Sequence, residues 1–123
     1  MTWVNGMFRG IRGATYVGKN EAESIIRETK ELLLEMVEKN NISTGDICSI
    51  LFTSTPDLTA AFPAMAAREL GWKYVPMLCS VEIDVPDSLH CCVRVLMQVN
   101  TSLKQSQVKH VYLKDAKKLR DDL

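Results

Sequence analysis

Residues 74–84 read YVPMLCSVEID, an apolar run that ends in two carboxylates, Glu82 and Asp84. We expect this run to form the central strand of a β-sheet. A carboxylate in such apolar sequence is costly to bury unless a cation pairs with it. Arg94, in the middle of the next apolar run, is the candidate partner. An arginine and a glutamate on adjacent strands form either a structural ion pair or a polar binding site, and the residues alone leave both readings open.

Outward from this strand, the chain alternates between strand-like and helix-like patterns. Apolar residues recur at i, i+3 and i+4 between 21 and 39, which predicts a helix that packs on the sheet and that Asn20 caps. Pro63 and Gly71 bound a second, shorter helix. Further strands are expected at 7–17, 47–54, 91–101 and 108–113, the second of them buried on both faces. Together these elements predict an α+β (mixed α/β) fold, a mixed β-sheet covered by helices.

The length of 123 residues fits one domain that spans 1–123. Residues 1–6 form an N-terminal extension without an assigned role, and the charged residues 114–123 form a tail that we expect to be mobile. The 15 basic and 15 acidic residues cancel, which argues against nucleic acid or an anionic membrane as a partner. No run approaches the roughly 20 apolar residues of a membrane span, and the N-terminus lacks a signal-peptide pattern. The cytoplasm is therefore the expected location.

The cysteines lack the paired spacing of a zinc site or a redox motif; they are Cys48, Cys79, Cys91 and Cys92. His90 precedes the adjacent pair, but neighbouring residues of a strand point to opposite faces and hold one metal ion poorly. We therefore expect free, buried thiols and no metal site.

The motifs of nucleophilic, nucleotide-dependent and metal-assisted enzymes are missing: the sequence has no G-x-S-x-G, P-loop, dinucleotide-binding or H-E-x-x-H pattern. What remains is a set of arginines with a glutamate, a thiol and a tyrosine, namely Arg12, Arg68, Arg94, Glu82, Cys79 and Tyr112. Such a set suits a small dianion. It can serve a reaction that needs electrostatic stabilisation and no nucleophile.

From residue 8 to residue 123 the sequence resembles the monofunctional chorismate mutases of the trimeric, pseudo-α/β-barrel class. The likeness lies in separate motifs that occur in the family's order: RGIRGAT at 9–15, TPDL at 55–58, FPA at 62–64, REL at 68–70, YVP at 74–76, RV at 94–95 and HVYL at 110–113. The resemblance implies an isomerase that rearranges chorismate to prephenate without a cofactor. This reaction belongs to the shikimate pathway and feeds phenylalanine and tyrosine synthesis. The resemblance also implies a homotrimer with its active sites at the subunit interfaces.

The resemblance assigns roles to the charged and polar residues. Arg94 lies against the ether oxygen of chorismate, where negative charge develops as the C–O bond breaks. Arg12 and Tyr112 hold a substrate carboxylate. Glu82 accepts a hydrogen bond from the ring hydroxyl and balances the arginines, with Cys79 beside it.

Further residues complete the site that the resemblance implies. The segment from 78 to 81 lines it and contributes Leu78, Ser80 and Val81, whereas a neighbouring subunit contributes Phe62, Ala64 and Arg68. The tail near Arg120 closes over the mouth of the site. Met65 stands where the family often has lysine and Leu78 where threonine is common, so the polar contacts there differ from the family pattern.

Two other readings remain open at this point. The enamine/imine deaminases, another class of small trimeric barrels, also combine arginine with a carboxylate at subunit interfaces. A non-catalytic ligand-binding or regulatory module would bind a dianion without turnover. Ammonia release distinguishes the first from a mutase, and turnover that Arg94→Ala abolishes excludes the second.

Overall fold

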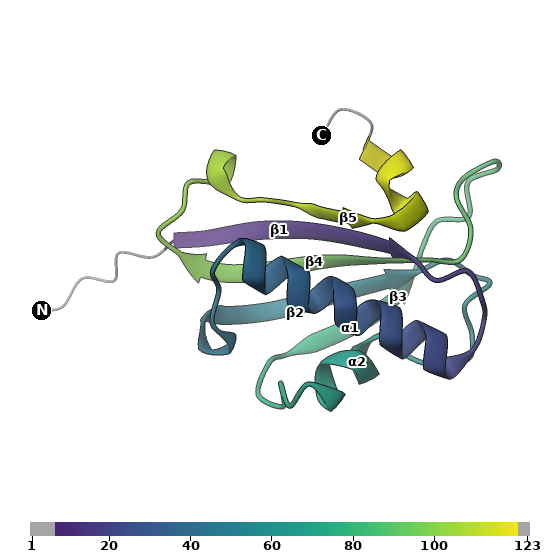
Figure 1. Cartoon of the computed structure of the whole chain (residues 1–123), viewed down its shortest axis with the longest axis horizontal. Helices are drawn as coiled ribbons and strands as arrows, with labels where there is room; N and C mark the ends of the chain where they lie inside the picture. Colours follow the sequence, from purple (N-terminus) through teal and green to yellow (C-terminus); the bar gives the residue numbers. More distant parts are fainter. Residues whose placement is uncertain (1–6, 121–123) are drawn as a thin grey trace, which may run out of the picture.

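The computed structural model describes residues 7–120, and of Arg120 only the backbone. Its body is a five-stranded sheet in the order β3-β2-β4-β1-β5 (Figure 1). The strands and helices are β1 (Met7–Tyr16), α1 (Ala22–Lys39), β2 (Ile47–Ser54), α2 (Ala64–Glu69), β3 (Met77–Val81), β4 (Cys92–Thr101) and β5 (Val111–Leu113). The 3₁₀ helices are η1 (Thr44–Asp46), η2 (Gln105–Gln107) and η3 (Lys114–Arg120).

The sheet is mixed. β4 pairs antiparallel with both β1 and β2, whereas the two edge strands, β5 and β3, pair parallel with β1 and β2. Figure 1 shows α1 lying across one face of this sheet with α2 beside it. The predicted α+β class, a mixed sheet covered by helices, is therefore confirmed.

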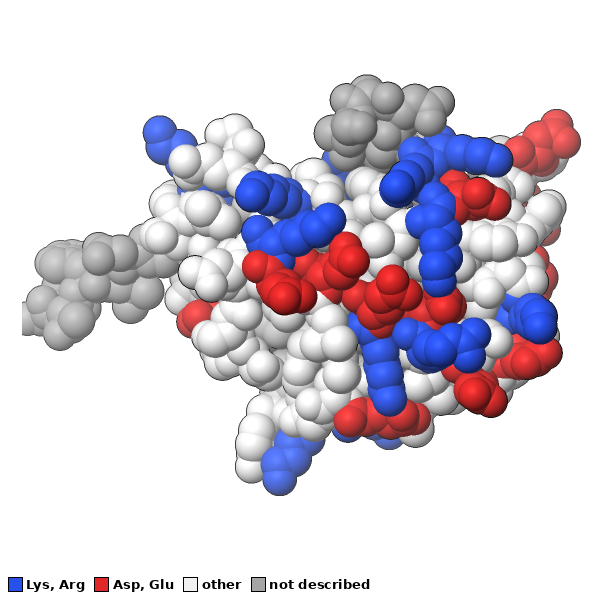
Figure 2. All heavy atoms as spheres, in the orientation of Figure 1, with Lys and Arg blue, Asp and Glu red and all other residues white. Residues whose placement is uncertain are grey.

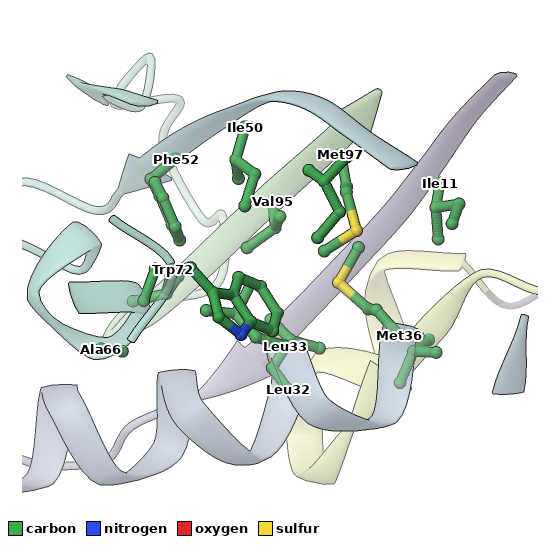
Figure 3. Packing of buried hydrophobic residues seen from close by; sticks show 14 of the residues in the cluster. Ile11, Leu32, Leu33, Met36, Ile50, Phe52, Ala66, Trp72, Val95 and Met97 are labelled. Carbon is green, nitrogen blue, oxygen red and sulfur yellow. The ribbon is translucent and has the colours of Figure 1, made fainter. Parts of the chain in front are cut away.

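The hydrophobic core lies between α1 and the sheet. The core residues of α1 follow the helical period and are fully buried: Ile25, Leu32, Leu33 and Met36. In Figure 3, Met36 points toward Met97 of β4. Gly13 of β1 permits this close packing, because a Cβ at that position would lie 2.5 Å from the Met36 sulfur. The helix α1 therefore packs tightly on one face of the sheet.

Asn20 does not cap α1 as the sequence suggested. The N-cap residue is Glu21, which makes no side-chain capping bond. The Asn20 side chain instead bonds Thr59 and Ala60 in the loop that precedes α2. The sequence motif was misleading because an asparagine next to a helix start can bond a distant loop as well as its own helix.

The run 74–84 is not the central strand. Only Met77–Val81 forms β3, which lies at one edge of the sheet, while β4 occupies the centre. Tyr74 and Ile83, near the two ends of the run, are 88% and 84% exposed. The apolar composition was misleading because these side chains are exposed in the single chain and not packed in its core.

Three other expectations need correction. β2 is buried on one face only, since Phe52 is fully buried but Leu51 is 39% exposed. The last strand is shorter than predicted and spans Val111–Leu113. The tail was expected to be mobile from residue 114, but residues 114–120 form η3 and Ala116 is fully buried. Residues 121–123, and the N-terminal extension at 1–6, lie outside the described residues.

The surface over α1 carries charges of both signs. Figure 2 shows Lys and Arg side chains intermixed with Asp and Glu on this face, so neither sign forms a continuous field there. Within residues 7–120, no helix has the length and apolar character needed to cross a membrane. Because the charges in Figure 2 are intermixed, the side of the protein that it shows has no broad basic surface of the kind that nucleic acid requires.

Candidate active site

The strand register gathers several polar side chains on the face of the sheet away from α1. Arg94 of β4 pairs with Ala14 of β1 on one side and with Thr53 of β2 on the other. Tyr112 of β5 also pairs with Ala14. Because side chains alternate along a strand and Val93 and Val95 are buried in the core, Arg94 projects from the opposite face. Arg12, two residues before Ala14, projects from the same face.

These residues form a cleft of about 200 Å3, which we call the arginine cleft. Its lining comes from four strands and η3: Arg12, Gly13, Leu51, Thr53, Arg94, Val95, Leu96, Tyr112 and Leu119. The structure thus brings together three of the residues that the sequence singled out, Arg12, Arg94 and Tyr112.

Arg94 pairs with Glu82, as the sequence predicted. The Arg94 Nε lies 3.3 Å from Glu82 Oε1, and the two side chains are 48% and 20% exposed. Thr53 Oγ1 donates a short hydrogen bond to the same Glu82 oxygen. An ion pair this exposed adds no more than about 1 kcal/mol to stability. Its main effect is to orient the Arg94 guanidinium, because Nε is held from the side of β3.

The arginine cleft offers guanidinium N–H groups that the protein itself does not use. Among residues 7–120, the terminal nitrogens of Arg94 and the whole guanidinium of Arg12 have no hydrogen-bond or ion-pair partner. Arginine donors in this arrangement match the geometry of a carboxylate. The cleft can therefore bind a small anion with two separate negative groups.

His110 supports the position of Arg12. The backbone N–H of Arg12 donates to His110 Nδ1 at 2.9 Å, just before β5 begins to pair with β1. This bond connects the strand of Arg12 to the strand of Tyr112. Sequence reasoning found no role for His110 because a bond from a side chain to a distant backbone leaves no local pattern.

A second cleft, with a volume of about 440 Å3, lies between β3 and the loop before α2. We call it the Phe62 cleft. Its lining combines the loop before α2 with β3: Ser54, Leu58, Thr59, Ala60, Ala61, Phe62, Pro63, Cys79, Ser80 and Val81. Cys79 pairs in register with the buried Phe52 and packs against the core. Within one chain, Cys79 therefore lies on the opposite face of the sheet from Arg94 and not beside the Arg94–Glu82 pair.

The remaining predicted site residues line neither cleft. Leu78 is 72% exposed and borders a hollow with Leu51 and Leu96 on the face away from α1. Ala64 and Arg68 lie on α2. The side chain of Arg120 lies outside the described residues. In a single chain the predicted site residues are therefore dispersed: some line the arginine cleft, some line the Phe62 cleft, and these others line neither.

Thr53 and Leu119 line the arginine cleft and were missed by sequence reasoning. Thr53 sits in an apolar run that reads as a buried strand, and only the pairing of β2 with β4 places it opposite Arg94. Leu119 belongs to the segment that was interpreted as a mobile tail. Neither residue carries a signal in the sequence that could have identified it.

A network of hydrogen bonds ties the loop after β2 to the start of β4. The Asp57 carboxylate accepts from the Cys91 N–H at 3.1 Å and from the Thr55 hydroxyl. Burial raises the pKa of the Asp57 carboxyl, but the hydrogen bonds from Thr55 and Cys91 outweigh it and hold that pKa below its usual value. Burial raises the pKa of the Cys92 thiol to about 12, so this thiol is no nucleophile at neutral pH.

The Asp57 network predicts a pH-dependent contribution to stability. A carboxyl whose pKa is lower in the folded state stabilises the fold above its unfolded value of about 3.9, and this contribution is lost as the pH falls through the folded pKa. Asp57→Asn should therefore lower the free energy of unfolding at pH 7 by about 0.5–1 kcal/mol, the range for a partly exposed hydrogen bond. Thermal unfolding of both proteins from pH 7 to pH 3 should show the difference shrinking below about pH 4. A difference that stays constant with pH would contradict this role.

Comparisons with known proteins agree with this geometry. The family model described as chorismate mutase type I matches residues 8–123. The chain is 48% identical over 118 residues to the chorismate mutase AroH of Bacillus subtilis (strain 168), covering 95% of this chain and 93% of the relative. It is 49% identical over 118 residues to the chorismate mutase AroH of Thermus thermophilus, covering 95% of this chain and 97% of the relative.

A solved structure has the same fold. A chorismate mutase from Clostridium thermocellum superposes with a TM-score of 0.87 at 55% sequence identity, and the match covers 88% of this chain and 96% of that one. The family-model match, over residues 8–123, includes all the residues that line the two clefts. The chain therefore belongs to the type I chorismate mutase family and is an enzyme of the isomerase class.

Proposed function

We propose that this protein rearranges chorismate to prephenate within the arginine cleft, without a covalent intermediate. The observation that carries the proposal is that the guanidinium of Arg12 and the terminal nitrogens of Arg94 face one cleft and lack protein partners among the described residues. Chorismate is a dianion, and its rearrangement is unimolecular. An enzyme accelerates such a reaction by holding the compact conformer and stabilising charge as the bond breaks.

In this proposal each side chain of the cleft has a separate task. Arg94 donates to the ether oxygen, where negative charge grows in the transition state. Arg12 and Tyr112 bind a carboxylate. Glu82 orients Arg94 through Nε, as the 3.3 Å contact supports, and accepts a hydrogen bond from the ring hydroxyl. Thr53, which donates to Glu82, holds this carboxylate in place.

Two neighbouring subunits together form each complete site, in a homotrimer that forms a pseudo-α/β barrel. The division of the predicted residues between two clefts supports this, because Phe62 and Cys79 can then face the arginine cleft of a neighbour together with Ala64 and Arg68. The face of the sheet away from α1 exposes large apolar side chains that a neighbour can cover: Phe8, Leu51, Leu78 and Leu96.

The trimer gives a prediction for solution behaviour. Sedimentation at equilibrium should give the mass of three chains at the concentrations used for assay. Leu78→Asp, on the exposed face, should shift the protein toward monomer and lower the activity in parallel, since a charge there would be buried without a partner. A stable monomer with full activity would contradict the shared site.

Incubation of the purified protein with chorismate tests the proposed function. The absorbance of chorismate should fall, and prephenate should appear in equal amount. Release of ammonia would point to a deaminase, and chorismate that is bound but unchanged would point to a ligand-binding module. Growth without phenylalanine and tyrosine in a strain that lacks its own chorismate mutase would place the activity in the synthesis of these amino acids in the cytoplasm.

A further inference from the structure

The loop between β2 and α2 is held by a side chain that the proposed chemistry does not use. Asn20, just before α1, accepts with Oδ1 from the backbone N–H groups of Thr59 at 2.8 Å and Ala60 at 2.9 Å. Its Nδ2 donates to Thr59 Oγ1 at 2.8 Å. Asn20 thus uses both ends of its amide on one loop, 39 and 40 residues away in the chain.

The backbone that Asn20 holds is a wall of the Phe62 cleft. Thr59 and Ala60 line this cleft together with Phe62 and Cys79. Phe62 lies two residues after Ala60, and its side chain is 70% exposed, so packing within the chain does not set its position. The backbone on either side has to set it. The backbone after Phe62 is fixed by the first turn of α2, where the Met65 N–H donates to the Phe62 carbonyl at 3.0 Å. The backbone before Phe62 is fixed by the hydrogen bonds from Thr59 and Ala60 to Asn20.

The other end of the loop is fixed to the strand of Arg94. Thr55 N–H donates to the Cys92 carbonyl at 3.0 Å, and Asp57 accepts from Cys91. Cys92 lies two residues before Arg94 on β4. The loop is therefore anchored at both ends, by β4 and by Asn20, which fixes Phe62 relative to the sheet that carries Arg94.

We propose that Asn20 is a positioning residue for the rearrangement: by holding Thr59 and Ala60 it places Phe62 against the substrate in the arginine cleft of the neighbouring subunit. This inference rests on the proposed function and on its shared site. Asn20 touches neither substrate nor reacting atoms. Its effect is transmitted through the backbone of the loop, where a displacement of about 1 Å is enough to lower the rate strongly.

Two substitutions test this role. Asn20→Ala removes all three hydrogen bonds and should lower kcat/KM for chorismate about 10-fold, with the circular dichroism spectrum and the trimer mass unchanged. Asn20→Asp keeps a carboxylate oxygen for both N–H groups and a second oxygen for the Thr59 hydroxyl, so it should stay within about 2-fold of the wild type. Ser43→Ala, which removes a loop hydrogen bond to Asp46 far from both clefts, is the matched control and should change nothing.

Mixed trimers test whether Asn20 acts on the neighbouring site. Chains with Arg94→Ala have an intact loop, and chains with Asn20→Ala have an intact arginine. Where the arginine cleft of an Asn20→Ala chain meets the loop of an Arg94→Ala chain, the site is complete. Co-expression of the two variants should therefore yield some sites with the wild-type kcat/KM, and the mixture should be more active per chain than either variant alone.

The outcomes separate this inference from the function on which it rests. A mixture whose kcat/KM does not exceed that of Asn20→Ala alone would overturn the inference. An Asn20→Ala protein with unchanged kcat/KM, or an Asn20→Asp protein as impaired as Asn20→Ala, would also overturn it. In each of these cases the wild type still converts chorismate. A wild-type protein that leaves chorismate intact would overturn the proposed function, and the inference with it.

Discussion

Replacing Arg94 by alanine should lower kcat for chorismate about 100- to 1,000-fold or more, the loss typical of removing one donor to a developing oxyanion. The side chain projects into the arginine cleft, and its terminal nitrogens have no partner among the described residues. These nitrogens are therefore free to meet the ether oxygen. Because the charge on that oxygen grows only in the transition state, the loss should fall mainly on kcat and little on KM.

Two further variants make the Arg94 result specific. Arg94→Lys keeps the charge but lacks the planar fork and the Nε that contacts Glu82, so it should restore only a small part of the activity. Arg27→Ala, on the exposed side of α1, removes an arginine far from the cleft and should leave kcat and KM unchanged. If Arg94→Ala folded, formed trimers and kept its kcat, the electrostatic role of Arg94 would be wrong.

Replacing Arg12 by alanine should raise KM about 10- to 100-fold, since a charge-assisted hydrogen bond to a carboxylate is worth about 1.5–3 kcal/mol. The guanidinium of Arg12 lines the same cleft but acts on a substrate carboxylate, whose charge is present before and after the reaction. Its loss should therefore weaken binding of substrate and transition state together. The bond from the Arg12 N–H to His110 survives the substitution, so the strand itself should stay in place.

Steady-state kinetics of Arg12→Ala and Arg94→Ala, measured side by side, test whether Arg12 acts on substrate binding and Arg94 on the transition state. We expect Arg12→Ala mainly to raise KM and Arg94→Ala mainly to lower kcat. Tyr112→Phe, which removes only a hydroxyl beside Arg12, should show a smaller loss of the same kind as Arg12→Ala. Equal losses in kcat for both arginine variants would mean that Arg12 also stabilises the transition state.

Much of the fold could be predicted from the sequence because it follows from local patterns. The helical period from 21 to 39 and the alternation from 91 to 101 correspond to α1 and β4, since one face of each element packs in a single core. The pairing of Arg94 with Glu82 was predictable for a related reason. Charged residues within apolar runs need a partner, and few are available.

Features that depend on distant segments could not be predicted in this way. The run 74–84 is apolar enough for a central strand, but nothing in it shows that β3 pairs with one neighbour only. Asn20 beside a helix start fits a cap equally well, and only the fold shows that Thr59 and Ala60 approach it. Cys79 lies on the face opposite Arg94 because the strand alternates, which the register with Phe52 reveals.

A crystal structure of the trimer with a stable bicyclic ether dicarboxylate, a mimic of the cyclic transition state, would show whether Arg94 meets the breaking C–O bond. We expect a terminal nitrogen of Arg94 at about 2.7–3.1 Å from the ether oxygen, Arg12 on a carboxylate, and Phe62 of a neighbouring chain against the ring. An ether oxygen that faced solvent or another donor, with Arg94 bound to Glu82 alone, would contradict it.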